Sequence, residues 1–201
     1  MKRRYWKKMK ESDLVEDFTV KVAWHEDPWQ IIKDNAIFTE HKFEQGKYPS
    51  SAWKKQMLLC EHSPIRSGRI IIEIHNVPVF VIDHFVRHHE GFVPFVSSLR
   101  DDRNEFPEGY IPNRETPNSM RFDGNFQAFI NISRKRLCGK AHKDTMRVWY
   151  AILDEVRKIE PELASVMVPE CVYRGFCPER KSCGYCGSEG WQKAIFDYRS
   201  R

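Results

Sequence analysis

The sequence predicts a mixed fold in which helices pack on a β-sheet, and three segments carry this prediction. Residues 69–75 have the sequence RIIIEIH, and β-branched residues at this density favour a buried strand. Residues 18–24 alternate valine with other side chains, as a half-buried strand does. Between residues 146 and 159, apolar side chains recur every three or four positions, which is the period of an amphipathic helix. A chain of 201 residues can enclose one core, or two small ones.

Two short helices are expected near the N-terminus. The first covers residues 28–38, with Asp27 as its N-cap and Pro28 at its first position, where proline's missing N–H is tolerated. The second covers residues 50–60 and is capped by its first or second residue, both serines.

The middle of the chain alternates irregular and regular segments. Residues 76–78, Asn-Val-Pro, are expected to turn the chain, and residues 79–88 to form a helix against the sheet. Residues 101–119 are rich in proline and are expected to form a loop or lid, followed by a short strand at 120–123.

The C-terminal half is predicted to be mainly helical. A long helical region starts near Asn125 and ends before Pro161, with Gly139 weakening its middle. Residues 191–198 are expected to form a short closing helix. The aromatic residues of this half are expected in the core rather than around a cofactor: Phe126, Phe129 and Trp149.

The composition favours an anionic ligand and argues against several classes of protein. The net charge is +5 and the pI about 8.9, less basic than a dedicated nucleic-acid-binding domain, so nucleic acid is not the expected partner. No apolar stretch suits a membrane span or a signal peptide, so membrane association is not expected. Cysteines without a secretory signal indicate a reducing compartment, and we expect a cytoplasmic protein.

A Cys-rich tail, residues 169–201, is expected after a charged arm, residues 1–16, and a main domain, residues 17–168. Its cysteines have the spacing C-x5-C-x5-C-x2-C: Cys171, Cys177, Cys183 and Cys186. Four thiolates among glycine and proline turns can form a tetrahedral zinc site, which would fasten a segment with little core. Packing thiols or an iron–sulfur cluster are the alternatives. Cys60 and Cys138 are expected in helices as ordinary apolar residues.

The segment 85–103, FVRHHEGFVPFVSSLRDDR, concentrates cations and hydroxyls next to Gly91 and Pro94. Guanidinium groups match the geometry of phosphate, and hydroxyl and backbone N–H groups can complete its binding site. A phosphate-bearing ligand is one interpretation, and a solvated basic loop after an amphipathic helix is the other. The residues concerned are Arg87, His88, His89, Ser97, Ser98, Arg100 and Arg103.

Three elements, in this order along the chain, resemble the signature of the flavin-dependent thymidylate synthases. The family's R-H-R-x7-S motif is matched by residues 87–97, which begin Arg-His-His and end on serine. Its upstream H-x-S/T-P/V-x-E-H element is matched by residues 61–67, Glu-His-Ser-Pro-Ile-Arg-Ser. Its downstream N-A-R-S-L-x-N-F-x-x-L-R element, followed by A-Q-W-E, is matched by residues 125–136 and 141–144. The resemblance covers roughly residues 50–165.

The resemblance implies an α+β fold, in which an antiparallel sheet packs with long helices, and a homotetramer with active sites shared between subunits. It implies that FAD binds non-covalently and that dUMP is methylated at C5 to dTMP. Methylenetetrahydrofolate would be the one-carbon donor and NADPH the reductant. In that family no protein nucleophile attacks the pyrimidine, so the protein's task is stacking, phosphate binding and charge control.

The resemblance also assigns residues to the site. Those implied to bind FAD are Ser63, Arg87, His88, His89, Asn125 and Asn131. Those implied to bind the pyrimidine nucleotide are His84, Ser97, Ser98, Arg100 and Arg136. Arg136 is the implied catalytic residue, because a guanidinium stays charged and can stabilise negative charge that develops on the pyrimidine ring.

The sequence departs from the family pattern at several polar positions. His89 and Gln127 stand where the family has arginine, and His84 where it has glutamine. Because a buried polar group that loses its partner rejects an analogue, such changes can alter which base is accepted. The alternatives are a related modification of a pyrimidine nucleotide, such as hydroxymethylation, and a homologue that binds nucleotide or nucleic acid without catalysis.

Overall fold

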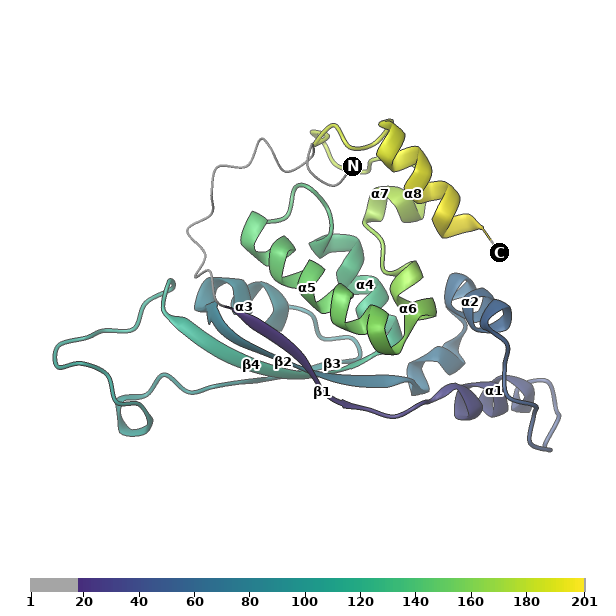
Figure 1. The fold of residues 1–201 in the computed structure, drawn as a ribbon, viewed down its shortest axis with the longest axis horizontal. Coiled ribbons are helices and arrows are strands. Elements are labelled where there is room, and N and C mark those ends of the chain that lie inside the picture. The colour runs from purple at the N-terminus through teal and green to yellow at the C-terminus, as the bar shows by residue number, and fades with distance from the viewer. Residues whose placement is uncertain (1–17, 201) are drawn as a thin grey trace.

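Among residues 18–200, which the computed structural model describes, four strands form one sheet. Their order is β1-β2-β4-β3, and every neighbouring pair is antiparallel, as the α+β prediction requires (Figure 1). The strands are β1 (Thr19–His25), β2 (Arg69–Pro78), β3 (Phe92–Val96) and β4 (Pro117–Asn125). The predicted arm, residues 1–16, lies outside the described residues.

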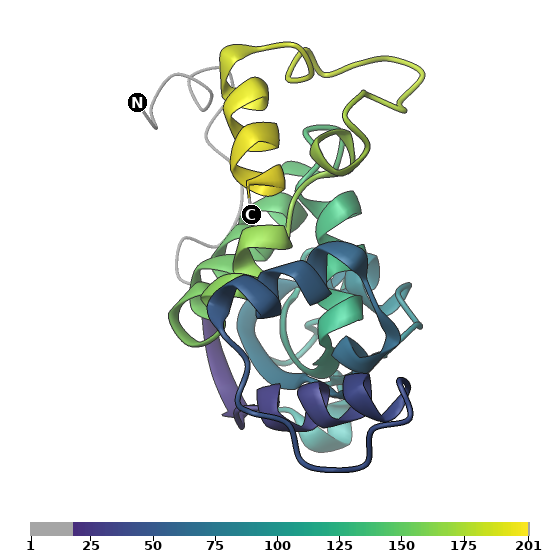
Figure 2. The same ribbon diagram turned by 90° about the vertical axis from the view of Figure 1, so that its right-hand side faces the viewer.

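The helices cover one face of the sheet and extend beyond it. In Figure 1, α4 and α5 lie over the sheet, α1 and α2 lie beyond one end of it, and Figure 2 shows α8 on the side of the helices away from the sheet. None of the described helices has the length and apolar character to cross a membrane. The helices are α1 (Trp29–Phe38), α2 (Ser51–Cys60), α3 (Val79–Val86), α4 (Phe126–Arg136), α5 (Lys143–Ile159), α6 (Pro161–Val166), α7 (Glu170–Arg174) and α8 (Glu189–Arg199), with 3-10 turns η2 (Ser63–Ser67) and η3 (Asp101–Arg103).

The core lies between the sheet and the helices that cover it. Alternate isoleucines of β2 are fully buried, and burying each such side chain stabilises the fold by about 1.5–3 kcal/mol. They belong to one cluster with the aromatic residues that the sequence places in the core, and that prediction is confirmed. The indole N–H of Trp149 is satisfied inside this core, because it donates to Ser133 Oγ at 2.9 Å. The buried residues named here are Ile70, Ile72, Ile74, Phe126, Phe129 and Trp149.

The opposite face of the sheet carries charge. Glu73 of β2 is bonded to Lys21 Nζ of β1 at 2.6 Å and to Arg121 Nε of β4 at 2.8 Å. The hydrogen bond from Lys21, which has the largest effect, and the bond from Arg121 lower the pKa of Glu73 to about 2. Side chains alternate between the two faces of a strand, so β2 presents isoleucine to the helices and a paired carboxylate to the other side.

Glu160, between α5 and α6, is only 3% exposed and joins three parts of the fold. Its Oε2 accepts a hydrogen bond from Trp29 Nε1 at 2.7 Å, and its Oε1 lies 2.9 Å from His25 Nε2. Burial raises the pKa of Glu160, while the bonds from Trp29 and His25 act in the opposite direction. One carboxylate therefore fastens β1 and α1 to the helical layer.

Both predicted N-terminal helices are confirmed, with one difference at a helix start. Ser50 caps α2, because its Oγ accepts a bond from the Trp53 N–H at 3.3 Å. Asp27 accepts a bond from the Trp29 N–H at 2.9 Å, but the predicted cap is wrong by one residue, because Pro28 rather than Asp27 occupies the N-cap of α1.

The turn predicted at residues 76–78 is wrong, because these residues continue β2 to Pro78. A bulge between Ile74 and Val77 accommodates Asn76, whose φ is +59°. Pairing with β4 resumes after the bulge, so the Asn-Val-Pro signal marks an irregularity within a strand.

The segment after α3 contains a strand that the sequence analysis did not predict. Residues 92–96 form β3, which pairs with β4 along its whole length. The short strand predicted at 120–123 is correspondingly longer, because β4 begins at Pro117. The loop expected at 101–119 therefore ends earlier, and it contains the 3-10 turn η3.

The long helical region predicted from Asn125 is two helices, α4 and α5, separated by residues 137–142. Gly139 lies in this turn, so the helical region is interrupted there rather than only weakened. Cys138 also lies in the turn, so its predicted place in a helix is wrong. The predicted stop before Pro161 is confirmed, and α6 begins at that proline.

Candidate functional site

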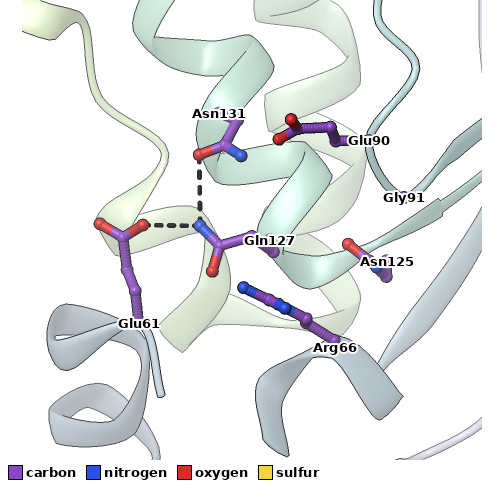
Figure 3. A pocket seen from close by; sticks show the side chains of 7 residues that line it. All are labelled: Glu61, Arg66, Glu90, Gly91, Asn125, Gln127 and Asn131. Carbon is purple, nitrogen blue, oxygen red and sulfur yellow. Dashed lines mark hydrogen bonds between the residues drawn. The ribbon is translucent and has the colours of Figure 1, made fainter. Parts of the chain in front are cut away.

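A polar cavity of about 510 Å³ opens at the N-terminal end of α4. Its lining comes from the cap and first turns of α4, from the segment 61–66 after α2 and from the turn before β3 (Figure 3). Asn125 and Asn131, both implied by the resemblance to bind FAD, share this cavity. The lining residues are Glu61, Arg66, Glu90, Gly91, Asn125, Gln127 and Asn131.

The start of α4 fixes Asn125 at the cavity. Its Oδ1 accepts a bond from the Ala128 N–H at 2.9 Å, which caps the helix, and its backbone N–H donates to the Gly91 carbonyl at 2.9 Å. Gly91 has a φ of +67°, and a Cβ at this position would clash with the Asn125 side chain. Glycine therefore lets the turn before β3 pass close to the amide.

A network of polar side chains forms the wall opposite the turn. Gln127 Nε2 donates to Glu61 Oε2 at 2.6 Å and to Asn131 Oδ1 at 3.2 Å (Figure 3). Arg134 donates to the other oxygen of Glu61 and, at 3.2 Å, to Asn131 Oδ1. Since Asn131 Oδ1 already accepts two bonds, its amide N–H groups are the part of the side chain that can donate to a ligand.

A second cluster surrounds Arg136 at the C-terminal end of α4. The guanidinium donates from Nε to His88 Nε2 at 3.1 Å and from Nη2 to the backbone carbonyl of His84. His88 Nε2 therefore acts as an acceptor, which requires a neutral ring with its proton on Nδ1. His84 Nδ1 lies 2.6 Å from Thr145 Oγ1 of α5. The contacts fix the plane of Arg136 and use two of its five N–H groups.

The Arg136 cluster holds both histidines neutral. Burial, followed by the charges of Arg136 and His89, lowers the pKa of His88 to about 4. Burial and the charges of Arg136 and Arg87 likewise lower the pKa of His84. Burial, together with Arg87, also lowers the pKa of Arg136, and a guanidinium still stays protonated. The cluster is therefore a positive site whose charge an anionic group would balance.

We expect the replacement His88→Gln to reduce the acid sensitivity of the fold. The folded-state pKa of about 4 lies below the unfolded value of about 6.5, so the unfolded chain binds the extra proton between these values. Stability is then lost as the pH falls from 6.5 to 4, by about 1–3 kcal/mol after allowance for partial exposure. Urea unfolding of both proteins across this range measures the difference. Parallel curves for the two proteins would contradict the assignment, and His62→Gln, at an exposed histidine, is the control.

The residues assigned to the nucleotide phosphate lie away from the α4 cavity within one chain. Ser97, Ser98 and Arg100 follow β3, whereas Gly91 precedes it. A strand of five residues spans about 17 Å, which separates them from the cavity. Arg100 is exposed, and its Nε is paired with Asp102 at 2.9 Å.

The remaining residues assigned to FAD are exposed. Arg87 and His89 flank His88 in the turn after α3, and Ser63 begins η2. The sequence analysis did not assign Glu61, Arg66 or Gln127 to the cavity, although all three stand in the matched motifs. Neither Glu90 nor Gly91 carried a signal beyond its place in the basic segment.

The predicted zinc ligands meet at one place without forming a metal site in this structure. Cys171, Cys177, Cys183 and Cys186 all line one small cavity. In the described part of the chain, however, no group of three or more His, Cys, Asp or Glu side chains is arranged to hold a metal ion. All six cysteines lie in that part and are free thiols.

The comparisons with known proteins give a structural likeness alone. No family model matches the sequence, and no curated protein matches it. The structure is similar to thymidylate synthase X (ThyX) from Helicobacter pylori solved with FAD and dUMP, with a TM-score of 0.58 and 13% identity, covering 75% of this chain and 97% of that one. A second structure of flavin-dependent thymidylate synthase ThyX from Helicobacter pylori, complexed with FAD and dUMP, gives a TM-score of 0.57 and 13% identity over 74% of this chain and 97% of that one. The chain therefore has the fold of the flavin-dependent thymidylate synthases.

Proposed function

We propose that this protein is a flavin-dependent enzyme that transfers a one-carbon unit to C5 of a pyrimidine deoxynucleotide. The most direct form of this reaction converts dUMP to dTMP, with methylenetetrahydrofolate as donor and NADPH as reductant. One observation carries the proposal: the fold matches 97% of the length of a protein that was solved with FAD and dUMP.

The cavity at α4 suits the polar edge of a flavin. Asn125, Gln127 and Asn131 offer amide groups, which can both donate to and accept from the ring and the ribityl chain. Arg66 adds a cation that can pair with a phosphate of FAD. When bound, FAD would supply the hydride that reduces the transferred carbon.

Arg136 is proposed to hold the pyrimidine. Its remaining N–H groups can donate to the ring edge, and its charge can stabilise negative charge that develops there. The neutral ring of His88 and the backbone carbonyl of His84 fix its orientation without adding a further positive charge. Nothing in this arrangement requires a covalent bond between protein and substrate.

A homotetramer would explain where the phosphate of the nucleotide binds. Within one chain, Ser97, Ser98 and Arg100 lie at the far end of β3 from the cavity. In an assembly with shared active sites, these residues of one subunit would complete the site of another. The exposed Arg87 and His89 would contact FAD in the same assembly.

The test is to purify the protein, record its flavin absorbance and incubate it with dUMP, methylenetetrahydrofolate and NADPH. Formation of dTMP, detected by mass spectrometry, is the expected result. A product heavier than dTMP by one oxygen would favour hydroxymethylation. Binding of FAD and dUMP without turnover would favour the non-catalytic homologue, and failure to bind either compound would refute the proposal.

A further inference from the structure

Five of the six cysteines surround one small cavity between the α4–α5 turn and the C-terminal tail. The turn contributes Cys138, and α7 contributes Cys171. The other three stand on the irregular segment 175–188 that joins α7 to α8: Cys177, Cys183 and Cys186. The volume of the cavity, about 10 Å³, is that of a site for a single ion or water molecule.

The thiols lie close enough to influence one another. Cys138 and Cys171 line the same cavity as the three cysteines of the segment 175–188, and its volume of about 10 Å³ leaves the thiols close together. Several thiolates in so small a space would repel one another unless a cation balanced their charge.

The segment 175–188 has little else to hold it in place. It contains no helix or strand, and Gly175, Gly184 and Gly187 have positive φ values. Its side chains that pack on the core are two of the clustered cysteines and Tyr185. A segment with so little apolar burial gains its order from a cross-link or a metal ion.

We propose that this cavity binds one Zn²⁺ through four thiolates, and that Cys138 is one of them. Cys138 belongs to the α4–α5 turn, so the ion would bind the tail to the main domain rather than only closing a loop within the tail. The cysteine side chains of this structure are not arranged as a finished metal site, so they must rotate toward the cavity as the ion binds. Zinc and thiolate are well matched, and each bound thiol releases its proton.

The test is to purify the full chain under reducing conditions and measure zinc and iron per chain. The expected result is about one zinc, released when a mercurial reagent modifies the thiols. Cys138→Ser and Cys171→Ser are expected to lose the ion, whereas Cys60→Ser, at an exposed cysteine outside the cavity, keeps it. Less than half an equivalent of zinc in the wild type, or iron with acid-labile sulfide in its place, would overturn the proposal. A full equivalent in Cys138→Ser would overturn the role of that residue.

A second measurement covers variants that fail to fold. Removing zinc from the wild-type protein with a chelator is expected to raise the rate of proteolytic cleavage within residues 175–188 by about tenfold, and added zinc to restore it. An unchanged rate would show that the ion does not hold this segment. Neither readout depends on flavin or on turnover, so the zinc proposal and the proposed enzymatic function can fail separately.

Discussion

Replacing Arg136 with alanine is expected to lower the rate of dTMP formation by at least about 100-fold while FAD stays bound. The substitution removes the charge that would stabilise the pyrimidine ring, and it leaves His84 and His88 without their shared donor. The cavity proposed for flavin is lined by other residues, so flavin content should not change. Initial rates and the ratio of flavin to protein absorbance measure the two effects.

Two further variants separate charge from geometry. Arg136→Lys keeps a positive charge but cannot donate to His88 and the His84 carbonyl in the same plane, so we expect only partial recovery. Arg157→Ala removes an exposed arginine of α5 that pairs with Asp154, and it should retain full activity. Normal turnover in Arg136→Ala would remove this residue from the proposed mechanism.

Replacing Glu160 with alanine is expected to destabilise the fold by about 3–5 kcal/mol. The buried N–H of Trp29 would lose its acceptor and His25 its partner, so β1 and α1 would lose their link to the helices. Glu160→Gln retains an acceptor for Trp29 and should lose only about 1–2 kcal/mol. Urea unfolding at neutral pH measures both changes.

The matched control for Glu160 is Glu155→Ala on α5, the helix that ends just before Glu160. Glu155 forms an exposed pair with Lys158, and such pairs contribute less than about 1 kcal/mol. If Glu160→Ala were no less stable than Glu155→Ala, the three-way contact would not contribute to stability.

Local signals made much of the fold predictable. The dense β-branched residues of β2 favour a strand, and Ser50 before α2 caps that helix. These signals lie within the elements that they specify, although β2 also needs its partners β1 and β4 to complete its hydrogen bonds. Asp27 also acts locally, because its carboxylate accepts a bond from the N–H of Trp29, the first residue of α1.

The features that sequence analysis did not predict depend on contacts between segments that are far apart in the chain. β3 contains a proline and is flanked by basic residues, and it exists because β4, about 30 residues further along, pairs with it. The cavity likewise joins Arg66, Glu90 and Asn125 from three segments. The order of the motifs along the chain was enough to predict Asn125. Whether Arg66 and Glu90 face the cavity depends on how the folded segments pack.

The place of β3 in the sheet has a consequence for solubility. Within the described residues it has a neighbour on its β4 side only, and its Val93, Phe95 and Val96 side chains are exposed. An unpaired edge strand with exposed apolar side chains is a place where other chains can add strands and aggregate. Pro94, in the middle of β3, lacks the backbone N–H with which an added strand would pair. It therefore opposes aggregation through this edge.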